Sequence, residues 1–192
     1  AMIRKLVPYY DRMIDVLVSI ISGPSDRRFA VMDLGCGTGS VSSAIAARFP
    51  NAELASVDLS DNMLRMAKAR LGDQIECVQA DFNTFEFTKQ YDLIVSSLAL
   101  HHLETDGDKL AFYKKIYSAL KPDGQFINID VFLAASGALQ AVYNDKLKSF
   151  MAEHITREEI ERGRDQLSAM LRDNGPVPDA PFEDLEVLVP AR

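Results

Sequence analysis

One stretch decides the fold of this chain: Val31-Met32-Asp33-Leu34-Gly35-Cys36-Gly37-Thr38-Gly39. An apolar run over residues 29–32 leads into Asp33, and a helix-like stretch over residues 41–49 follows the last glycine. This pattern predicts a buried parallel strand, a tight glycine turn and the start of a helix. Glycine is needed where the backbone takes a positive φ or approaches a ligand closely, because a Cβ would clash there. We therefore expect the turn at the carboxyl edge of a sheet, where open α/β folds bind ligands.

The spacing of the glycines distinguishes this turn from a dinucleotide-binding turn. The dinucleotide pattern is G-x-G-x-x-G, whereas this chain has G-x-G-x-G with Asp33 two residues before the first glycine. An acid at that place suits a cationic ligand better than a pyrophosphate. The segment over residues 33–39 resembles motif I of the class I S-adenosylmethionine-dependent methyltransferases. The alternative is a glycine turn with a purely structural role.

The composition is that of an ordinary globular protein. The chain has 192 residues, 47% hydrophobic and 26% charged, which predicts one domain with a substantial core. The net charge of −7 and the lack of a basic run argue against nucleic acid as a partner. Cys36 and Cys77 have no metal-binding spacing, so we expect core side chains and no metal site. No signal peptide or membrane-spanning run is visible, so we expect a cytoplasmic protein without membrane association.

Strand and helix signals alternate along the chain. Strands are predicted over residues 29–34, 53–58, 75–79, 91–96 and 125–131. Helices are predicted over residues 9–22, 39–49, 61–71, 105–120 and 139–150, with a turn over residues 121–124. The helix over residues 105–120 is expected to bury Leu110, Tyr113, Ile116, Tyr117 and Leu120. Such alternation is typical of a parallel sheet with crossover helices.

The resemblance to the methyltransferases implies a particular α/β architecture. It is a Rossmann-like, doubly wound sheet of strand order 3-2-1-4-5 with helices on both faces and a C-terminal edge strand. We expect one domain over residues 1–192. Within it, residues 3–24 form an N-terminal helical cap, residues 29–131 the cofactor-binding core, and residues 132–192 a helical insertion with the edge strand.

The tail of the chain departs from the family pattern. Thr156 and Glu159 form a predicted capping box, which opens a helix to about residue 172. A last strand is predicted over residues 185–189. Related methyltransferases carry a helix before this strand and a hairpin strand after it. Either the chain is shortened, or a partner or a swapped segment completes the sheet edge, because an uncovered edge favours aggregation. A homodimer is one possible form of such a partner.

Asp58 ends the second predicted strand. Its carboxylate can accept both hydroxyl groups of a ribose that lies across the sheet edge. The alternative is that Asp58 only caps the following helix, but Ser60 and Asp61 are also available as caps. We therefore favour the ribose role, and Leu59 would then flank the adenine.

Asp81 ends the third predicted strand. The resemblance implies that its carboxylate accepts the exocyclic amine of adenine, with the backbone or ring of Phe82 beside it. The alternative is an ordinary surface turn. Near the N-terminus, Val7-Pro8-Tyr9-Tyr10-Asp11 resembles a cap over the cofactor site. This would place Tyr10 against the cofactor, whereas the alternative is that the tyrosines pack on the core.

Two adjacent histidines follow the fourth predicted strand, in the segment that begins at Ser97. In the expected strand order this segment faces the sulfonium and the transferable methyl group. Adjacent residues point in different directions, so at most one of His101 and His102 is expected to face the site. A general-base role for either is the weaker hypothesis, because the flanking leucines favour packing.

The resemblance implies S-adenosylmethionine as the cofactor. The implied cofactor-binding residues are Tyr10, Asp33, Gly35, Gly37, Gly39, Asp58, Leu59, Asp81, Phe82 and Ser97. The leading hypothesis is a methyltransferase with a small-molecule acceptor, since no Asn-Pro-Pro-Tyr, Asp-Pro-Pro-Tyr or Pro-Cys follows the fourth strand. Two alternatives stay open: an enzyme of the type that makes carboxy-S-adenosylmethionine, and a module that binds the cofactor without turnover. A nicotinamide-dependent dehydrogenase fits least, because its glycine spacing differs.

Overall fold

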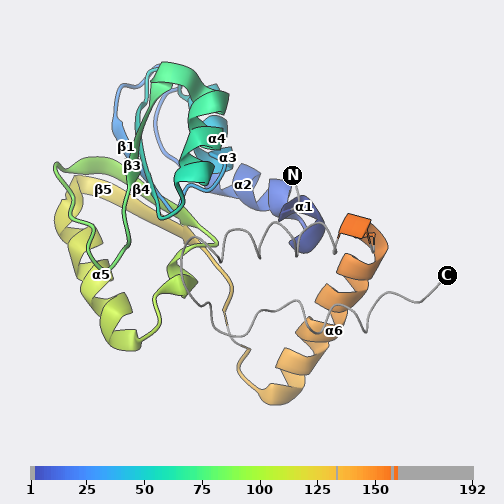
Figure 1. Cartoon of the computed structure of the whole chain (residues 1–192). Coiled ribbons are helices and arrows are strands. Elements are labelled where there is room, and N and C mark those ends of the chain that lie inside the picture. The colour runs from blue at the N-terminus through green and yellow to red at the C-terminus, as the bar shows by residue number, and fades with distance from the viewer. Residues whose placement is uncertain (1–2, 133, 157, 160–192) are drawn as a thin grey trace. The chain divides into compact units, whose positions relative to one another are not determined.

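The computed structural model describes residues 3–132, 134–156 and 158–159. It divides the chain into two compact units (Figure 1). The larger unit spans residues 12–132, and the smaller one combines residues 1–11 with residues 133–192. The glycine turn and the strands on either side of it all belong to the larger unit.

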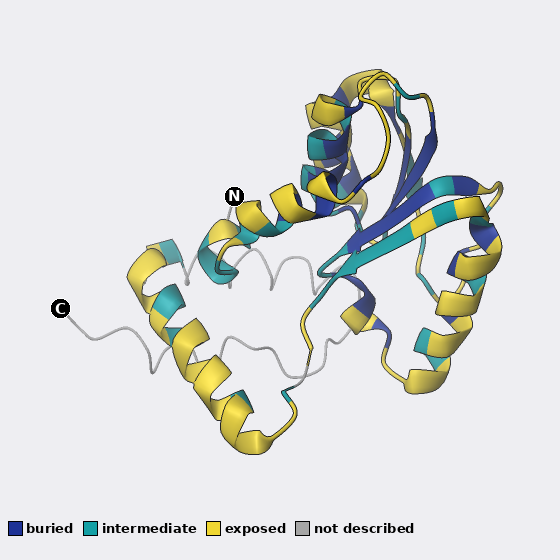
Figure 2. Cartoon of the chain, turned by 180° about the vertical axis from the view of Figure 1, so that it is seen from behind, coloured by how far each residue is buried: buried dark blue, intermediate teal, exposed yellow. Residues whose placement is uncertain are grey.

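The larger unit is built on a five-stranded parallel sheet of order β3-β2-β1-β4-β5. The strands are β1 (Ala30–Leu34), β2 (Glu53–Asp58), β3 (Ile75–Gln79), β4 (Tyr91–Ser97) and β5 (Leu120–Ile129). This confirms the predicted order 3-2-1-4-5. Since β1 lies between β2 and β4 and is covered on both faces, all five of its residues are buried (Figure 2).

Helices cover both faces of the sheet, as expected (Figure 1). They are α3 (Ser40–Arg48), α4 (Asp61–Leu71) and α5 (Asp106–Ala119), with part of α2 (Tyr10–Ser19). Side chains along β1 point alternately to the two faces. Met32 joins Phe112 and Ile116 of α5 in one buried cluster. Asp33 points to the opposite face, where it is bonded to Ser42 of α3, and α4 contacts α3.

The helix ends follow capping chemistry. Ser60 Oγ accepts the N–H of Met63 at 3.4 Å where α4 begins. Gly72 ends α4 with a φ of 59°. A capping box formed by Thr105 and Asp108 opens α5. The predicted bounds of α4 are therefore confirmed at both ends.

The buried face of α5 differs from the expected one. Leu110, Tyr113 and Tyr117 are not buried, because they are 57%, 39% and 81% exposed. The buried residues of α5 are Phe112, Ile116 and Ala119. Helical spacing is compatible with both the expected and the observed buried face. The observed face is buried because Phe112 packs into a cluster of aromatic rings. The ring of Phe112 lies 5.0 Å from that of Phe82 and 6.3 Å from that of Phe87.

The predicted turn over residues 121–124 lies inside β5 as a bulge. Leu120 and Gln125 pair with residues of β4 that are only two positions apart, so the residues between them loop out of the register. Asp123, one of the residues that loop out, has a φ of 65°. The strand ends at Ile129, two residues before the predicted end.

The described part of the smaller unit contains α1 (Ile3–Leu6) and α6 (Gly137–His154), which contact each other. Lys5 Nζ lies 2.6 Å from Glu159 Oε1. The predicted capping box is present, since Thr156 Oγ1 accepts the N–H of Glu159 and the Glu159 carboxylate accepts the N–H of Thr156. No residue of α6 is buried (Figure 2). The helix predicted beyond residue 159 and the strand over residues 185–189 lie outside the described residues.

None of the helices in the described ranges has the length and apolar character needed to cross a membrane.

Candidate functional site

The glycine turn is fixed to the carboxyl end of β2 by backbone hydrogen bonds. The N–H groups of Gly35 and Cys36 donate to the carbonyl of Val57 at 2.8 and 3.2 Å. Gly35 has a φ of +69°, and a Cβ there would lie 2.3 Å from the Cβ of Ala99, in the segment after β4. Only glycine fits between β1 and that segment, so the turn brings three strand ends together.

Glycine is required at the other two positions of the turn, Gly39 and Gly37, for different physical reasons. Gly39 has a φ of +75°, and a Cβ there would lie 3.0 Å from the Cβ of Ala67 in α4. Gly39 thus permits the close approach of α4 to the start of α3. Gly37 has a φ of +52°, and a Cβ there would meet nothing within 4 Å. The backbone of Gly37 therefore borders open space at the carboxyl edge of the sheet, where a ligand can approach it.

Asp58, at the end of β2, is held in place beside this space. Its Oδ2 accepts the N–H of Gly37 at 2.8 Å, and its Oδ1 accepts the N–H of Ser60 at 2.9 Å. The side chain of Ser60, not that of Asp58, caps α4. A carboxylate has about four lone-pair sites, so both oxygens of Asp58 can accept further hydrogen bonds. Leu59 beside it is 65% exposed.

Asp33 lies beneath the turn and is only 1% exposed. The hydroxyl of Ser42 donates to its Oδ2 at 2.6 Å, and Ser56 Oγ lies 3.2 Å from that hydroxyl. Burial raises the pKa of Asp33 to about 6; the bonds from Ser42 lower it, and the charge of Asp58 raises it. A ligand in the open space can interact with Asp33 through its field without direct contact.

We expect Asp33→Asn to remove one component of the pH dependence of stability. The native state holds the Asp33 proton more tightly than the unfolded state does. The stabilisation from this group is therefore complete below about pH 4 and is lost as the pH rises through about 6. The shift corresponds to a change of up to about 3 kcal/mol in the unfolding free energy. Urea denaturation of both proteins between pH 4 and pH 7 measures it, and a pH-independent difference would contradict the prediction.

Asp81 and Phe82 follow β3 at the same edge of the sheet. The Asp81 carboxylate is exposed and accepts the backbone and side-chain N–H groups of Asn83 at 2.8 and 2.9 Å. The ring of Phe82 points into the core, where its tip would lie 3.4 Å from a Cβ on Gly35. Phe82 is half-buried, so a ligand contact through its backbone or its ring stays a prediction, as does the contact of the Asp81 carboxylate with adenine.

The segment after β4 carries local strain. Leu98 has a φ of 54°, which is rare for a bulky residue, and its N–H donates to the carbonyl of Ile129 in β5 at 2.8 Å. Ser97, the last residue of β4, pairs with Ile129. Outliers of this kind cluster at ligand sites. The strain redirects the chain into the short 3-10 helix η2 (Leu100–His102).

The two histidines of η2 have different surroundings. His101 Nδ1 lies 2.6 Å from Asp130 Oδ1, just after β5, and the backbone N–H of His101 donates to the other oxygen at 3.1 Å. Burial lowers the pKa of His102; a charge on His101 lowers it further, while Asp130 and Asp58 oppose this. Sequence reasoning missed Asp130, although its place at the end of a parallel strand was a signal.

The comparison with protein families agrees with this geometry. The sequence model described as a methyltransferase domain matches residues 31–124, from β1 into the bulge of β5. These residues include the glycine turn, Asp58, Asp81 and the histidines. The chain contains a class I S-adenosylmethionine-dependent methyltransferase domain.

Relatives of this methyltransferase domain have several activities. The chain is 30% identical over 103 residues to the malonyl-[acyl-carrier protein] O-methyltransferase of Priestia megaterium. This alignment covers 53% of this chain and 36% of the relative. The chain is also 24% identical over 191 residues to the carboxy-S-adenosyl-L-methionine synthase of Nautilia profundicola, covering 97% of this chain and 79% of that protein. The chain spans about two fifths of the length of the malonyl-[acyl-carrier protein] O-methyltransferases that it matches.

A solved structure is also similar to the methyltransferase domain. It is S-adenosylmethionine-bound CalS10, an amino pentose methyltransferase from Micromonospora echinaspora. The TM-score is 0.55 at 25% sequence identity, and the match covers 66% of this chain and 52% of that one.

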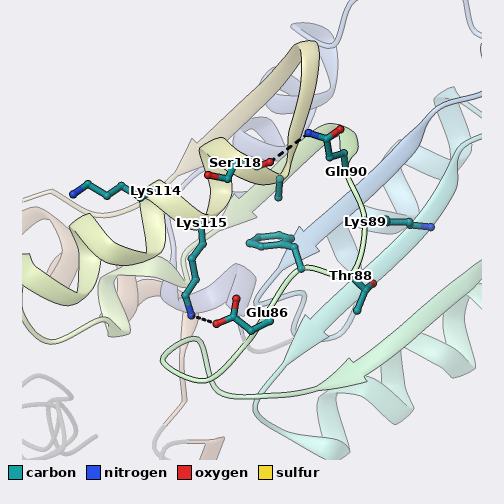
Figure 3. Close-up of a pocket in the computed structure, with 9 residues that line it drawn as sticks. Glu86, Thr88, Lys89, Gln90, Lys114, Lys115 and Ser118 are labelled. Carbon is teal, nitrogen blue, oxygen red and sulfur yellow. Dashed lines mark hydrogen bonds and ion pairs between the residues drawn. The ribbon is translucent and has the colours of Figure 1, made fainter.

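A pocket of about 510 Å³ lies elsewhere in the methyltransferase domain (Figure 3). It is lined by residues 86–90 and by Lys114, Lys115, Ser118 and Ala119 of α5. Gln90 directly precedes β4, so this pocket lies at the amino end of the strand, opposite to Ser97 and the glycine turn. Lys115 is already paired with Glu86 at 2.7 Å. The pocket is therefore separate from the candidate site.

The predicted contact of Tyr10 and the possibility of a metal ion complete the description of the site. Tyr10 belongs to the smaller unit, so its contact with the cofactor stays a prediction. Among the described residues, no group of three or more His, Cys, Asp or Glu side chains is arranged to hold a metal ion.

Proposed function

We propose that this chain binds S-adenosylmethionine and transfers its methyl group to a small-molecule acceptor. The observation that supports this best is the open space at Gly37 beside the Asp58 carboxylate. A ribose fits there with its two hydroxyl groups donating to Asp58. Leu59 would contact the adenine from the side, and Asp81 would accept its amine. S-adenosylmethionine supplies an electrophilic methyl group on a cationic sulfonium.

The charge of the site supports a cationic ligand. Asp33 is buried beneath the turn with its pKa raised to about 6. None of the ion pairs in the described residues supplies it with a cation. A positive ligand would lower that pKa and recover part of the burial cost. Proximity and orientation can supply much of the rate enhancement of such a transfer.

Native mass spectrometry and calorimetry test this function. Purified protein is expected to retain S-adenosylmethionine or S-adenosylhomocysteine, or to bind both when they are added. Release of S-adenosylhomocysteine with a panel of small hydroxyl, amine and carboxylate acceptors then reports turnover. A folded protein that binds neither nucleoside would contradict the proposal, and binding without turnover would favour a module without activity.

The second candidate is synthesis of carboxy-S-adenosylmethionine. It is favoured by the similarity to carboxy-S-adenosyl-L-methionine synthase, which extends over 97% of this chain. The two candidates share the cofactor site and differ in the group carried on sulfur. A retained nucleoside heavier than S-adenosylmethionine by a carboxyl group would favour the second candidate.

We expect Gly37→Ala to weaken cofactor binding about tenfold, because its methyl group would occupy the open space. Gly72→Ala is the matched control, since Gly72 also has a positive φ, +59°, and open space around a Cβ. Gly72 lies at the far end of α4, roughly 16 Å along the helix axis from its start.

Gly37→Ala should lose about 1–2 kcal/mol of unfolding free energy through backbone strain. Gly72→Ala should lose more, because the φ of 59° and the ψ of −135° at Gly72 lie near a backbone region that only glycine adopts readily. Calorimetry with S-adenosylhomocysteine should separate them. Equal affinity losses in the two variants would mean that strain, not occupied space, is the cause.

A further inference from the structure

A carboxylate–imidazole pair stands at the carboxyl edge of the sheet. The side chain of Asp130 is only 5% exposed. Its oxygens accept the backbone N–H groups of His101 at 3.1 Å and Val131 at 2.9 Å, besides the bond to the His101 ring at 2.6 Å. This carboxylate is thus fixed by backbone bonds on either side before it bonds to the imidazole.

The pair fixes which nitrogen of His101 is free. Because the Asp130 carboxylate accepts, Nδ1 carries the proton in the neutral ring, and Nε2 keeps its lone pair. No described residue hydrogen-bonds to Nε2, and the side chain of His101 is 35% exposed. His102 has no hydrogen bond to a carboxylate in the described part of the chain, so no such partner fixes which of its nitrogens carries the proton. Of the two histidines of η2, His101 is thus the one whose proton-accepting nitrogen is fixed by a carboxylate partner.

The pair follows β4 and β5, and β4 is the neighbour of β1, whose glycine turn borders the proposed site of the methyl donor. Ala99 packs directly against Gly35, since a Cβ on Gly35 would lie 2.3 Å from the Cβ of Ala99. His101 follows Ala99 by two residues. Asp130 follows Ile129, the residue of β5 that pairs with Ser97. The pair and the glycine turn thus stand at the same edge, on adjoining strands.

We propose that His101, positioned by Asp130, is the general base of the reaction, and that the acceptor is therefore a small molecule with a neutral hydroxyl group. This rests on the proposed function. The hydroxyl oxygen forms the new bond to the methyl carbon while the carbon–sulfur bond breaks and its electron pair stays on sulfur. The hydroxyl proton moves to Nε2, and Asp130 stabilises the imidazolium. A carboxylate acceptor has no proton to lose and would not need this pair.

Acylation by diethyl pyrocarbonate tests the pair without knowledge of the acceptor, because this reagent attacks an unprotonated, accessible ring nitrogen. His154 is the internal control, since its Nδ1 bonds to a neutral carbonyl, that of Phe150, at 2.7 Å. With S-adenosylhomocysteine present, we expect His101 to react about tenfold faster than His154 in peptide mapping. Asp130→Asn should remove the difference.

Two results would overturn the proposal. The first is a reaction of His101 no faster than that of His154, a comparison that needs no variant. The second is complete protection of His101 by S-adenosylhomocysteine, because an acceptor must reach Nε2 while the cofactor is bound. Calorimetry with S-adenosylhomocysteine reports on the proposed function alone, so the two failures are distinguishable.

Turnover gives an independent readout on hydroxyl and carboxylate acceptors of matched size, phenols and benzoates. His101→Asn should lower kcat on phenols by about 10²–10⁴-fold and leave the KM for S-adenosylmethionine unchanged. His154→Asn should leave both values unchanged. Methylation of benzoates but not phenols by the wild-type protein, at a rate that His101→Asn preserves, would overturn the proposal.

Discussion

Asp58→Ala is expected to weaken the binding of S-adenosylmethionine by about 100-fold or more. Two hydrogen bonds from ribose hydroxyls to a carboxylate are lost, and each is worth about 1.5–3 kcal/mol. Each 1.4 kcal/mol corresponds to about tenfold in affinity. Calorimetry on the folded variant measures the loss, and an unchanged affinity would remove Asp58 from the site.

The same substitution also disturbs the protein itself. The N–H groups of Gly37 and Ser60 lose their acceptor, and because both residues are half-buried, each loss costs about 0.5–1.5 kcal/mol. Asp58→Asn provides a milder variant, because its amide oxygen can still accept one of these bonds. The affinity of Asp58→Asn should fall between those of the wild type and Asp58→Ala.

Asp92→Ala is the matched control for this experiment. The Asp92 carboxylate also accepts a backbone N–H, that of Ala30, at 2.8 Å, and it binds Lys121 Nζ at 2.8 Å. It lies at the amino end of the sheet, beside the start of β1. Asp92→Ala should therefore lower the stability and leave the affinity unchanged. Similar affinity losses in Asp58→Ala and Asp92→Ala would point to a global effect.

The sequence predicts the strand order and the carboxylates at the strand ends for a shared physical reason. Strands buried on both faces are continuous apolar runs, and the helices between them end at turn residues such as Gly72. In a parallel sheet the carboxyl ends meet at one edge, so Asp58 and Asp81 had to lie there. The face of α5 could not be predicted in this way, because Tyr113 and Phe112 are both aromatic and only the packing of rings selects Phe112.

In the site, too, the sequence pattern predicts which residues lie at the edge of the sheet but not how their side chains pack. The glycine spacing predicts a turn, but only the neighbours of each Cβ reveal that Gly39 serves helix packing while Gly37 borders open space. Leu98, which has a φ of 54°, lies three residues before His101, whose ring nitrogen Nδ1 lies 2.6 Å from Asp130 Oδ1. The place of Asp130 at the end of a parallel strand indicates that it lies at the carboxyl edge, but the sequence does not show that its carboxylate bonds to His101.

Gly35→Ala is expected to lower the unfolding free energy by about 2–5 kcal/mol. A Cβ at residue 35 would lie 2.3 Å from the Cβ of Ala99, which is 6% exposed and cannot move into solvent. Overpacking of this kind costs about 1–3 kcal/mol, and the φ of +69° adds about 1–2 kcal/mol for a residue with a side chain. Urea denaturation measures the loss.

The double variant Gly35→Ala with Ala99→Gly separates these two costs. Without the Cβ of residue 99, the next contacts of the new Cβ are Phe82 at 3.4 Å and the Ala99 Cα at 3.7 Å, which are ordinary distances. The double variant should therefore recover about 1–3 kcal/mol relative to the sum of the single variants, and only the backbone strain should remain. Additive losses would show that the segment after β4 moves away freely, in which case it would not hold His101 and Ser97 in fixed positions beside the glycine turn.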